Sequence, residues 1–563
     1  MLRLARAFHL VVALLAITAL AGCGGSDGNA AGSGGTGTGA VGGAGGTGGG
    51  GAGGFAGVPS AFELAYLADQ ERAGFQDLYV GRTNGTDNHR VNHPLEVGRV
   101  LSFQWSPDGA RIAYLADDDK DLFPGCSTCV QEVFSSRPDG SDDRRVNGPL
   151  VEGGRVETFR WSPDGTRIAY LATQDADGIA ELYTSTATGT DNRKVSGSLT
   201  VGDVVADFQW SPDGARIAYL LYREADNVRE VYSNTYDGMD NQRVSGTLLP
   251  NRQAQSFKWS PDGSRIAYVA DQDTDNVFEL FTSAFDGSDN QKANGALVTG
   301  SQGSRSSAFE WSPDGARIAY QTDQDVVGVG ELYTSAPNGS DNQKVNSPLP
   351  EGSSVSGFAW SPDGTLLGFI ADRDAPSVRE LYTARPDGSD ERKVNGTLPE
   401  GGFGFVATFQ WSPDGAWIAY LADQENPSVW ELYTVHPDGA ENHKVNGTLT
   451  NPIGAVGNYS WSPDSTRIAY RATQDDADLL ELFTSAPDGA DNWKVNGRLL
   501  PDGDVESFAW SPDGERLAYQ AAQNTAGVFE IYSSVWNGTE NQRANPPLRE
   551  GGSASAFAWS PAP

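Results

Sequence analysis

The sequence predicts an all-β fold built from ten copies of one unit of about 50 residues. The first observation is a repeat: the segment FQWSPDGARIAYLA at 103–116 returns with few changes along most of the chain. The second is a pattern of strands and turns within each copy, and the third is the phase at which the copies begin and end. Together they favour a single closed β-propeller of four-stranded blades.

Ten tryptophans mark the copies. Their spacing of 49 to 56 residues fits a propeller blade and is long for helical repeats. They are Trp105, Trp161, Trp210, Trp259, Trp311, Trp360, Trp411, Trp461, Trp510 and Trp559.

Residues 207–244 show the elements of one copy in order. The alternation in 207–210 predicts a first strand, A, and the Ser-Pro-Asp-Gly segment 211–214 predicts a tight turn. Residues 216–221 are rich in β-branched and aromatic side chains and predict strand B. After a polar connection, 230–233 predicts strand C, and a turn at 236–238 leads to a short strand D at 243–244.

The phase of the repeat predicts closure of the ring. The first copy begins on a B strand at 63–68, and the chain ends on a lone A strand at 556–559. If that last strand completes the first blade, no unpaired strand edge is left exposed at either end of the repeat. We therefore expect one ring of ten blades and a monomer, with two smaller rings, for example five and five, as the alternative.

The Trp-Ser-Pro-Asp-Gly-x-Arg-Ile-Ala-Tyr unit resembles the PD40 repeat, a WD40-like, TolB-type repeat of bacterial β-propellers. The resemblance covers the chain from Phe62 onward. It implies the propeller fold, which serves many unrelated roles, so function must be argued from a site.

The N-terminus predicts an exported lipoprotein. Residues 1–22 have basic Arg3 and Arg6 followed by a short apolar run, as in a signal peptide. Leu20-Ala21-Gly22-Cys23 resembles the bacterial lipobox, which implies cleavage before Cys23 and its acylation. Residues 23–57 then form the lipidated end and a Gly-rich tether. We expect a protein held in the cell envelope by its lipid alone, at the outer membrane if the host has one.

The composition restricts the partners. The formal net charge is −34, from 74 acidic and 40 basic side chains. This charge argues against nucleic acid and against direct contact with anionic lipid headgroups. It favours cations or basic partners.

Two further cysteines lie in the B–C connection of the second blade. Cys126 and Cys129 are close in sequence, and we expect them to form a disulfide in an oxidising compartment. A redox motif or a zinc site finds no support in the neighbouring residues.

The B–C connections are acidic in most copies. Asp271, Asp273 and Asp275 alternate along one of them, as carboxylates do in some Ca²⁺ loops. An EF-hand is excluded, because Asn276 and Thr282 occupy the positions of its Gly and Glu. The alternative is that these residues only end strands and cap turns. Calcium is the one cofactor that the sequence raises.

No catalytic set stands out from the repeats. The acids that open strand C recur as a column, so a structural role is expected for Glu181, Glu279, Glu331, Glu380, Glu431 and Glu481. Aromatic residues outside the repeat columns are the better binding candidates: Phe403, Trp417, Trp430, Trp493 and Trp536. The predicted function is a binding or scaffold module, not an enzyme, for a protein, peptide or polysaccharide partner outside the cytoplasm. The alternative is a propeller hydrolase or lyase acting on glycans or peptides.

Overall fold

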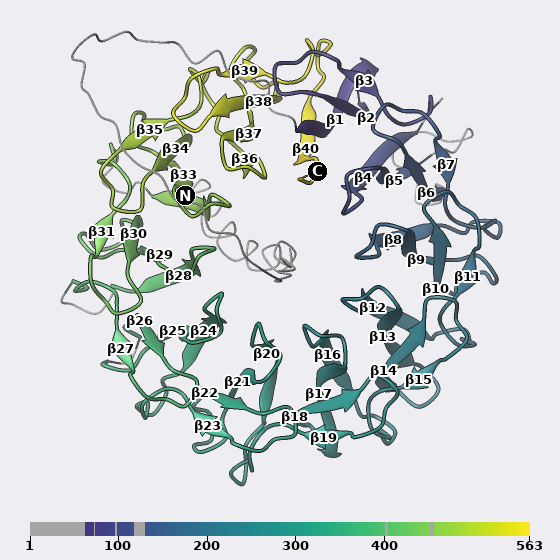
Figure 1. Cartoon of the computed structure of the whole chain (residues 1–563), viewed down its shortest axis with the longest axis vertical. Coiled ribbons are helices and arrows are strands. Elements are labelled where there is room, and N and C mark those ends of the chain that lie inside the picture. The colour runs from purple at the N-terminus through teal and green to yellow at the C-terminus, as the bar shows by residue number, and fades with distance from the viewer. Residues whose placement is uncertain are drawn as a thin grey trace, which may run out of the picture. The chain divides into compact units, whose positions relative to one another are not determined.

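The computed structural model describes residues 62–562 apart from 73, 96–97, 118–129, 376, 400–403 and 451–454. In that part of the chain all the regular elements are β-strands. They form ten four-stranded sheets, arranged as the blades of a ring (Figure 1). The predicted ten-bladed β-propeller is confirmed.

Each blade has the same strand order from the inside of the ring outward (Figure 1). The inner A strands are β40 (Ala554–Trp559), β4 (Arg99–Trp105), β8 (Val156–Trp161), β12 (Val204–Trp210), β16 (Ala254–Trp259), β20 (Ser304–Trp311), β24 (Val355–Trp360), β28 (Val406–Trp411), β32 (Val456–Trp461) and β36 (Ser507–Trp510). The B strands are β1 (Glu63–Arg72), β5 (Ile112–Asp117), β9 (Arg167–Ala172), β13 (Arg216–Arg223), β17 (Arg265–Thr274), β21 (Ile318–Thr322), β25 (Leu367–Ala371), β29 (Ile418–Ala422), β33 (Ile468–Ala472) and β37 (Arg516–Ala521).

The two outer strands of each blade follow in the same blade order. The C strands are β2 (Phe75–Arg82), β6 (Gln131–Ser136), β10 (Glu181–Thr186), β14 (Val228–Thr235), β18 (Val277–Ala284), β22 (Glu331–Ser335), β26 (Glu380–Ala384), β30 (Glu431–Val435), β34 (Glu481–Ser485) and β38 (Glu530–Val535). The short D strands are β3 (His89–Arg90), β7 (Arg144–Arg145), β11 (Arg193–Lys194), β15 (Gln242–Arg243), β19 (Gln291–Lys292), β23 (Gln343–Lys344), β27 (Arg392–Lys393), β31 (His443–Lys444), β35 (Asn492–Lys494) and β39 (Gln542–Arg543).

Strands B and C form the interior of each blade. In β9 and β10 nearly every residue is buried, including Ile168, Tyr170 and Leu182. Both faces of a blade pack against its neighbours, which suits the β-branched and aromatic residues of the Arg-Ile-Ala-Tyr segment. Accordingly, the buried apolar residues gather between adjacent blades, as where Val231 and Val244 of one blade meet Phe257 and Tyr268 of the next.

Where it is present, the Ser-Pro-Asp-Gly segment closes the A–B hairpin through its own side chains. Ser211 Oγ donates to Asp213 Oδ1 at 2.6 Å and accepts from the backbone N–H of Arg216 at 2.9 Å. Asp213 Oδ1 also accepts from the Ala215 N–H at 3.0 Å. Gly214 takes a φ of 69°, in the left-handed region that favours glycine. Because the turn satisfies its own polar groups, it can recur in successive blades without help from the rest of the ring.

The repeated tryptophans join the blades through hydrogen bonds. Trp161 Nε1 donates to the Gln104 carbonyl at 3.2 Å, one blade earlier, and Trp210 Nε1 donates to the Arg160 carbonyl at 3.2 Å. The series closes where Trp105 Nε1 donates to the Ala558 carbonyl at 3.3 Å. The tryptophans therefore link neighbouring blades.

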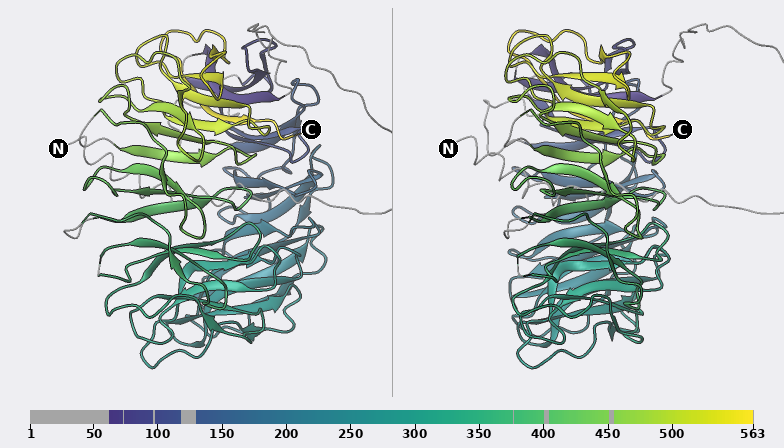
Figure 2. Two further views of the ribbon diagram at one scale, coloured as in Figure 1. Left: turned by 60° about the vertical axis from the view of Figure 1, so that its left-hand side comes forward. Right: turned by 90° about the vertical axis from the view of Figure 1, so that its left-hand side faces the viewer.

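The C-terminal strand completes the first blade. β40 pairs antiparallel with β1, with Ala558 opposite Ala65, and the Ser560 N–H donates to the Glu63 carbonyl at 2.9 Å. The predicted closure is confirmed, and the alternative of two smaller rings is wrong. In the side views of Figure 2 the strands run across the ring from one rim to the other.

Among the described residues, none belongs to a helix with the length and apolar character needed to cross a membrane.

Candidate functional site at the loop rim

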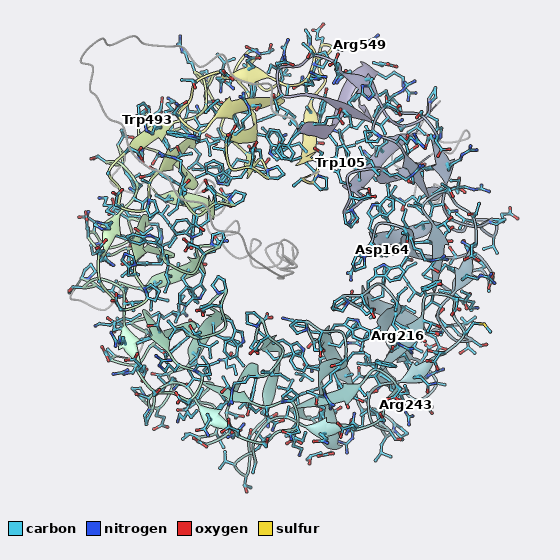
Figure 3. All side chains as sticks on the ribbon, viewed as in Figure 1. Trp105, Asp164, Arg216, Arg243, Trp493 and Arg549 are labelled. Carbon is cyan, nitrogen blue, oxygen red and sulfur yellow. The ribbon has the colours of Figure 1, made fainter. Side chains whose placement is uncertain are left out.

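The ring has two rims of different construction. The turn rim carries the A–B turns, such as 211–214, and the C–D turns, such as 236–241. The loop rim carries the B–C connections, such as 224–227, and the D–A loops, such as 244–253. In Figure 3, Asp164 of an A–B turn lies toward the centre of the ring, and Arg243 of β15 lies on its outer side. Loops held on a rigid scaffold are where binding sites usually form, so the loop rim is the candidate site.

The first acid of the predicted calcium segment is a buried acceptor. Asp271 Oδ1 accepts from the backbone N–H of Gln253 at 2.6 Å, and its Oδ2 accepts from that of Asn276 at 3.3 Å. It thus ties a D–A loop to the B–C connection of the same blade. Asp423 does the same for the N–H groups of Phe405, at 2.7 Å, and Ser428, at 3.1 Å. This position is part of the scaffold.

The second acid belongs to an ion-pair column. Lys292 of β19 lies 2.8 Å from Asp273 and 2.9 Å from the buried Glu279 of β18. Burial lowers the pKa of Lys292, but its hydrogen bonds to the two carboxylates outweigh this and hold the pKa above its ordinary value. The same arrangement recurs at Lys194 with Asp175 and Glu181, Lys344 with Asp325 and Glu331, Lys393 with Asp374 and Glu380, Lys444 with Glu425 and Glu431, and Lys494 with Asp475 and Glu481.

The third acid points to solvent. The side chain of Asp275 is 65% exposed, and its Oδ1 lies 3.7 Å from Nε of Arg252. The structure also places Asp271 and Asp273 within β17 rather than in a loop, because the hairpin extends to Thr274. Over the described ranges, no three His, Cys, Asp or Glu side chains form a group that could hold a metal ion. The three aspartates have separate partners, and calcium binding stays a prediction.

The glutamates that open strand C have structural partners. Tyr333 Oη donates to Glu331 Oε2 at 3.1 Å and Tyr382 Oη donates to Glu380 Oε2 at 3.1 Å, two residues along the same strand. Each glutamate also pairs with the lysine of strand D. Their recurrence in the sequence therefore reflects one polar arrangement repeated around the ring.

Most of the off-repeat aromatics pack against other side chains. Trp417 stacks on His436 with ring centroids 3.9 Å apart, and Trp536 lies 3.8 Å beneath the Arg467 guanidinium. Trp430 meets Phe405 edge-on at 4.6 Å. Trp493 of β35 is 45% exposed, on the outer side of the ring (Figure 3). Its Nε1 donates to Asp491 at 3.2 Å.

Several predicted residues lie outside the described part of the chain. They are Cys23, Cys126, Cys129 and Phe403. Their predicted roles in lipidation, disulfide formation and binding stay predictions.

The comparisons with known proteins agree with the resemblance in the repeats. Residues 256–512 match the family model described as "TolB beta propeller domain", PD40. No curated protein matches the chain.

Solved structures show more distant likeness. Dipeptidyl peptidase 4 of Porphyromonas gingivalis is 12% identical with a TM-score of 0.46, over 69% of this chain. The match spans only 58% of the peptidase. A structure described as TolB from Agrobacterium tumefaciens is 20% identical with a TM-score of 0.28, over 52% of this chain and 93% of that one. An oligogalacturonate lyase in complex with manganese is 13% identical with a TM-score of 0.34. The match covers 69% of this chain and 98% of the lyase.

Proposed function

We propose that this protein is a binding module of the bacterial cell envelope, whose propeller presents the loop rim to a protein, peptide or polysaccharide partner. The proposal assigns no catalytic residue. In this proposal the acyl chains on Cys23 anchor the protein in the membrane, which is the outer membrane if the host has one. The Gly-rich segment that follows Cys23 is the tether between this anchor and the propeller.

The observation that carries the proposal is a contrast between scaffold and loop tips. Recurring residues such as Trp161, Asp271 and Lys292 are engaged within or between blades. The exposed tips of the loop rim differ from blade to blade, as at Val201 and Glu152. A repeated frame with variable exposed tips is the arrangement expected of a recognition surface.

The experiment is site-specific photocrosslinking in living cells. A photoreactive amino acid replaces Val201 on the loop rim or, as the matched control, exposed Met239 on the turn rim. We expect one dominant adduct from position 201 that is absent from position 239, with a partner that rebinds the purified protein. The absence of an adduct from position 201, and from each further loop-rim position tested in turn, would contradict a binding role for this rim.

A further inference from the structure

Among the described residues, the strongly exposed apolar side chains of the loop rim lie in one sector. Val201 is 76% exposed, Leu249 60%, Val326 50% and Val327 51%. Val201 and Leu249 lie in the D–A loops that lead into β12 and β16, and the other two lie between β21 and β22. Within the described residues, the large apolar side chains that are strongly exposed on this rim all belong to blades 4 to 6, which begin at β12, β16 and β20.

The aliphatic tips are departures from the repeat rather than requirements of the fold. Val201 occupies the D–A loop position that holds exposed acids in other blades: Glu152, Glu351 and Glu550. Val327 occupies the B–C position that holds Asp177, Asp226 and Asp275. Blades form equally well with acids at these positions, so the valines have no evident role in folding.

The tips belong to one connected stretch of rim. The backbone of Gly202, next to Val201, packs against Glu224. The following B–C connection bonds to the next D–A loop, where Asn251 N–H donates to the Asp226 carbonyl at 3.1 Å. That turn also contains Leu249, whose carbonyl accepts from the Arg252 N–H at 3.1 Å.

The stretch continues across blades 5 and 6. Nε of Arg252 lies 3.7 Å from Oδ1 of Asp275. The Phe278 N–H donates to the Gln302 carbonyl at 3.1 Å, which joins blade 5 to the D–A loop that enters blade 6. In that loop the backbone of Gly300 faces the side chain of Val327. The apolar tips are therefore parts of a single surface.

The same surface is acidic between its apolar tips. Glu224 and Asp226 are exposed, and neither forms an ion pair with a described residue. Asp275 is 65% exposed, and its one ion-pair partner in the described part of the chain is Arg252, at 3.7 Å. A partner that covers the valines must also meet these carboxylates, which favours a basic partner and disfavours an anionic one.

We propose that the apolar sector of the loop rim, formed by Val201, Leu249, Val326 and Val327, docks a segment of a partner protein that alternates aliphatic side chains with Lys or Arg. The inference rests on the proposed binding function and assigns it a place and a ligand chemistry. The aliphatic side chains would cover the four tips, and the basic ones would pair with Glu224, Asp226 and Asp275.

The test is a fluorescence anisotropy titration of the full chain against a labelled peptide of alternating Leu and Lys. Two control peptides each lack one of the two features. A peptide of alternating Ser and Lys lacks the aliphatic side chains, and a peptide of alternating Leu and Glu lacks the basic ones. The variant pair Val201→Glu and Val327→Asp introduces the residue types that other blades carry, so its fold is expected to persist. Met239→Glu, at a side chain 83% exposed on the turn rim, is the matched control.

The added charges separate the two contributions to binding. If attraction were only Coulombic, Val201→Glu with Val327→Asp would tighten binding of the Leu–Lys peptide. Docking on the apolar tips predicts at least a tenfold loss instead, with Met239→Glu unchanged or slightly tighter. Glu224→Gln with Asp226→Asn is expected to weaken binding as well, and the other two peptides are expected to bind at least tenfold more weakly.

Other outcomes overturn the proposal. The absence of saturable binding to the wild type contradicts the assigned ligand chemistry. Equal binding by the valine variants moves the site elsewhere and leaves the proposed binding function standing. Valine-dependent cosedimentation with phosphatidylcholine vesicles, without peptide binding, assigns the sector to a lipid surface. A failure here together with no crosslinked partner from the loop rim contradicts both proposals.

Discussion

Three aspartates that alternate along one connection of the loop rim have different roles at the residue scale. Asp271 caps backbone N–H groups, Asp273 pairs with Lys292, and Asp275 points to solvent. The difference arises from the hairpin, which buries the first side chain and places the second beside strand D. Aspartates that alternate in sequence therefore need not lie close enough together to bind one cation.

Replacing Asp271 with Ala is expected to lower stability by about 1–3 kcal/mol, because it removes the buried carboxylate that accepts from the backbone N–H groups of Gln253 and Asn276. Asp275→Ala, at an exposed position, is expected to change stability by less than about 0.5 kcal/mol. Urea unfolding with millimolar CaCl₂ and with EDTA measures both. A calcium-dependent rise in stability that either substitution abolishes would establish the predicted calcium site, whereas equal curves would leave Asp271 a purely structural cap.

A coordinated replacement shows how strongly neighbours constrain the repeat. Tyr268 Oη donates to Gln272 at 2.7 Å and accepts from Asn290 at 2.5 Å. In blade 7 (β24–β27), Phe369 takes the place of this tyrosine, and Arg373 pairs with Glu391 at 2.9 Å in place of the Gln and Asn. Because a buried polar atom needs a partner, the loss of the tyrosine hydroxyl in this blade is accompanied by a new pair between the two positions that the hydroxyl contacts in blade 5.

The buried tyrosines predict a loss of stability at alkaline pH. Burial raises the pKa to about 12 at Tyr170, Tyr219, Tyr268, Tyr320, Tyr420 and Tyr519. In the unfolded chain the pKa of tyrosine is about 10, so the unfolded chain loses these protons first as the pH rises. The contribution of these tyrosines to the free energy of unfolding is complete below pH ~10 and is lost between pH ~10 and ~12.

Urea midpoints measured from pH 8 to 11.5, with absorbance at 295 nm to follow ionisation, test this. Tyr268→Phe is expected to make the decline shallower, because it removes one of the titrating groups. Ionisation of all tyrosines near pH 10 in the folded protein would contradict the prediction.

At the element scale, the blade is complete only when four strands are present, and β40 is the one supplied from far along the chain. It pairs with β1 and contributes Trp559, whose Nε1 donates to the Ala509 carbonyl at 3.1 Å. Its loss would expose the edge of β1 and remove the inter-blade hydrogen bonds on both sides.

Deletion of residues 554–563 is therefore expected to open the ring and cause aggregation. Size-exclusion chromatography and a thermal melt measure the effect. A synthetic peptide of the deleted sequence is expected to restore a monomeric elution volume by adding its strand to β1, whereas a scrambled peptide is not. An unchanged melt and elution volume after the deletion would show that β40 does not close the ring.

At the scale of the whole molecule, the net charge bears on the predicted membrane attachment. Because a net charge of −34 disfavours anionic lipid surfaces, we expect attachment to require the predicted acyl chains at Cys23. Cys23→Ser is expected to move the protein from the detergent phase to the aqueous phase in a Triton X-114 partition. Its control is Cys126→Ser, which is expected to leave the partition unchanged. Detergent-phase recovery of Cys23→Ser would contradict the lipid anchor.

The strand order, the turns, the blade count and the closure by the C-terminal strand could all be predicted from the amino-acid sequence. All four follow from local alternation and from a repeat whose phase is visible in residues 63–68 and 556–559. The roles of the polar residues could not be predicted in this way, because strand pairing is what brings partners such as Asp273 and Lys292 together. The tertiary structure also revealed the apolar sector, since exposure at Val201 and Val327 depends on how loops of neighbouring blades pack, which no local pattern encodes.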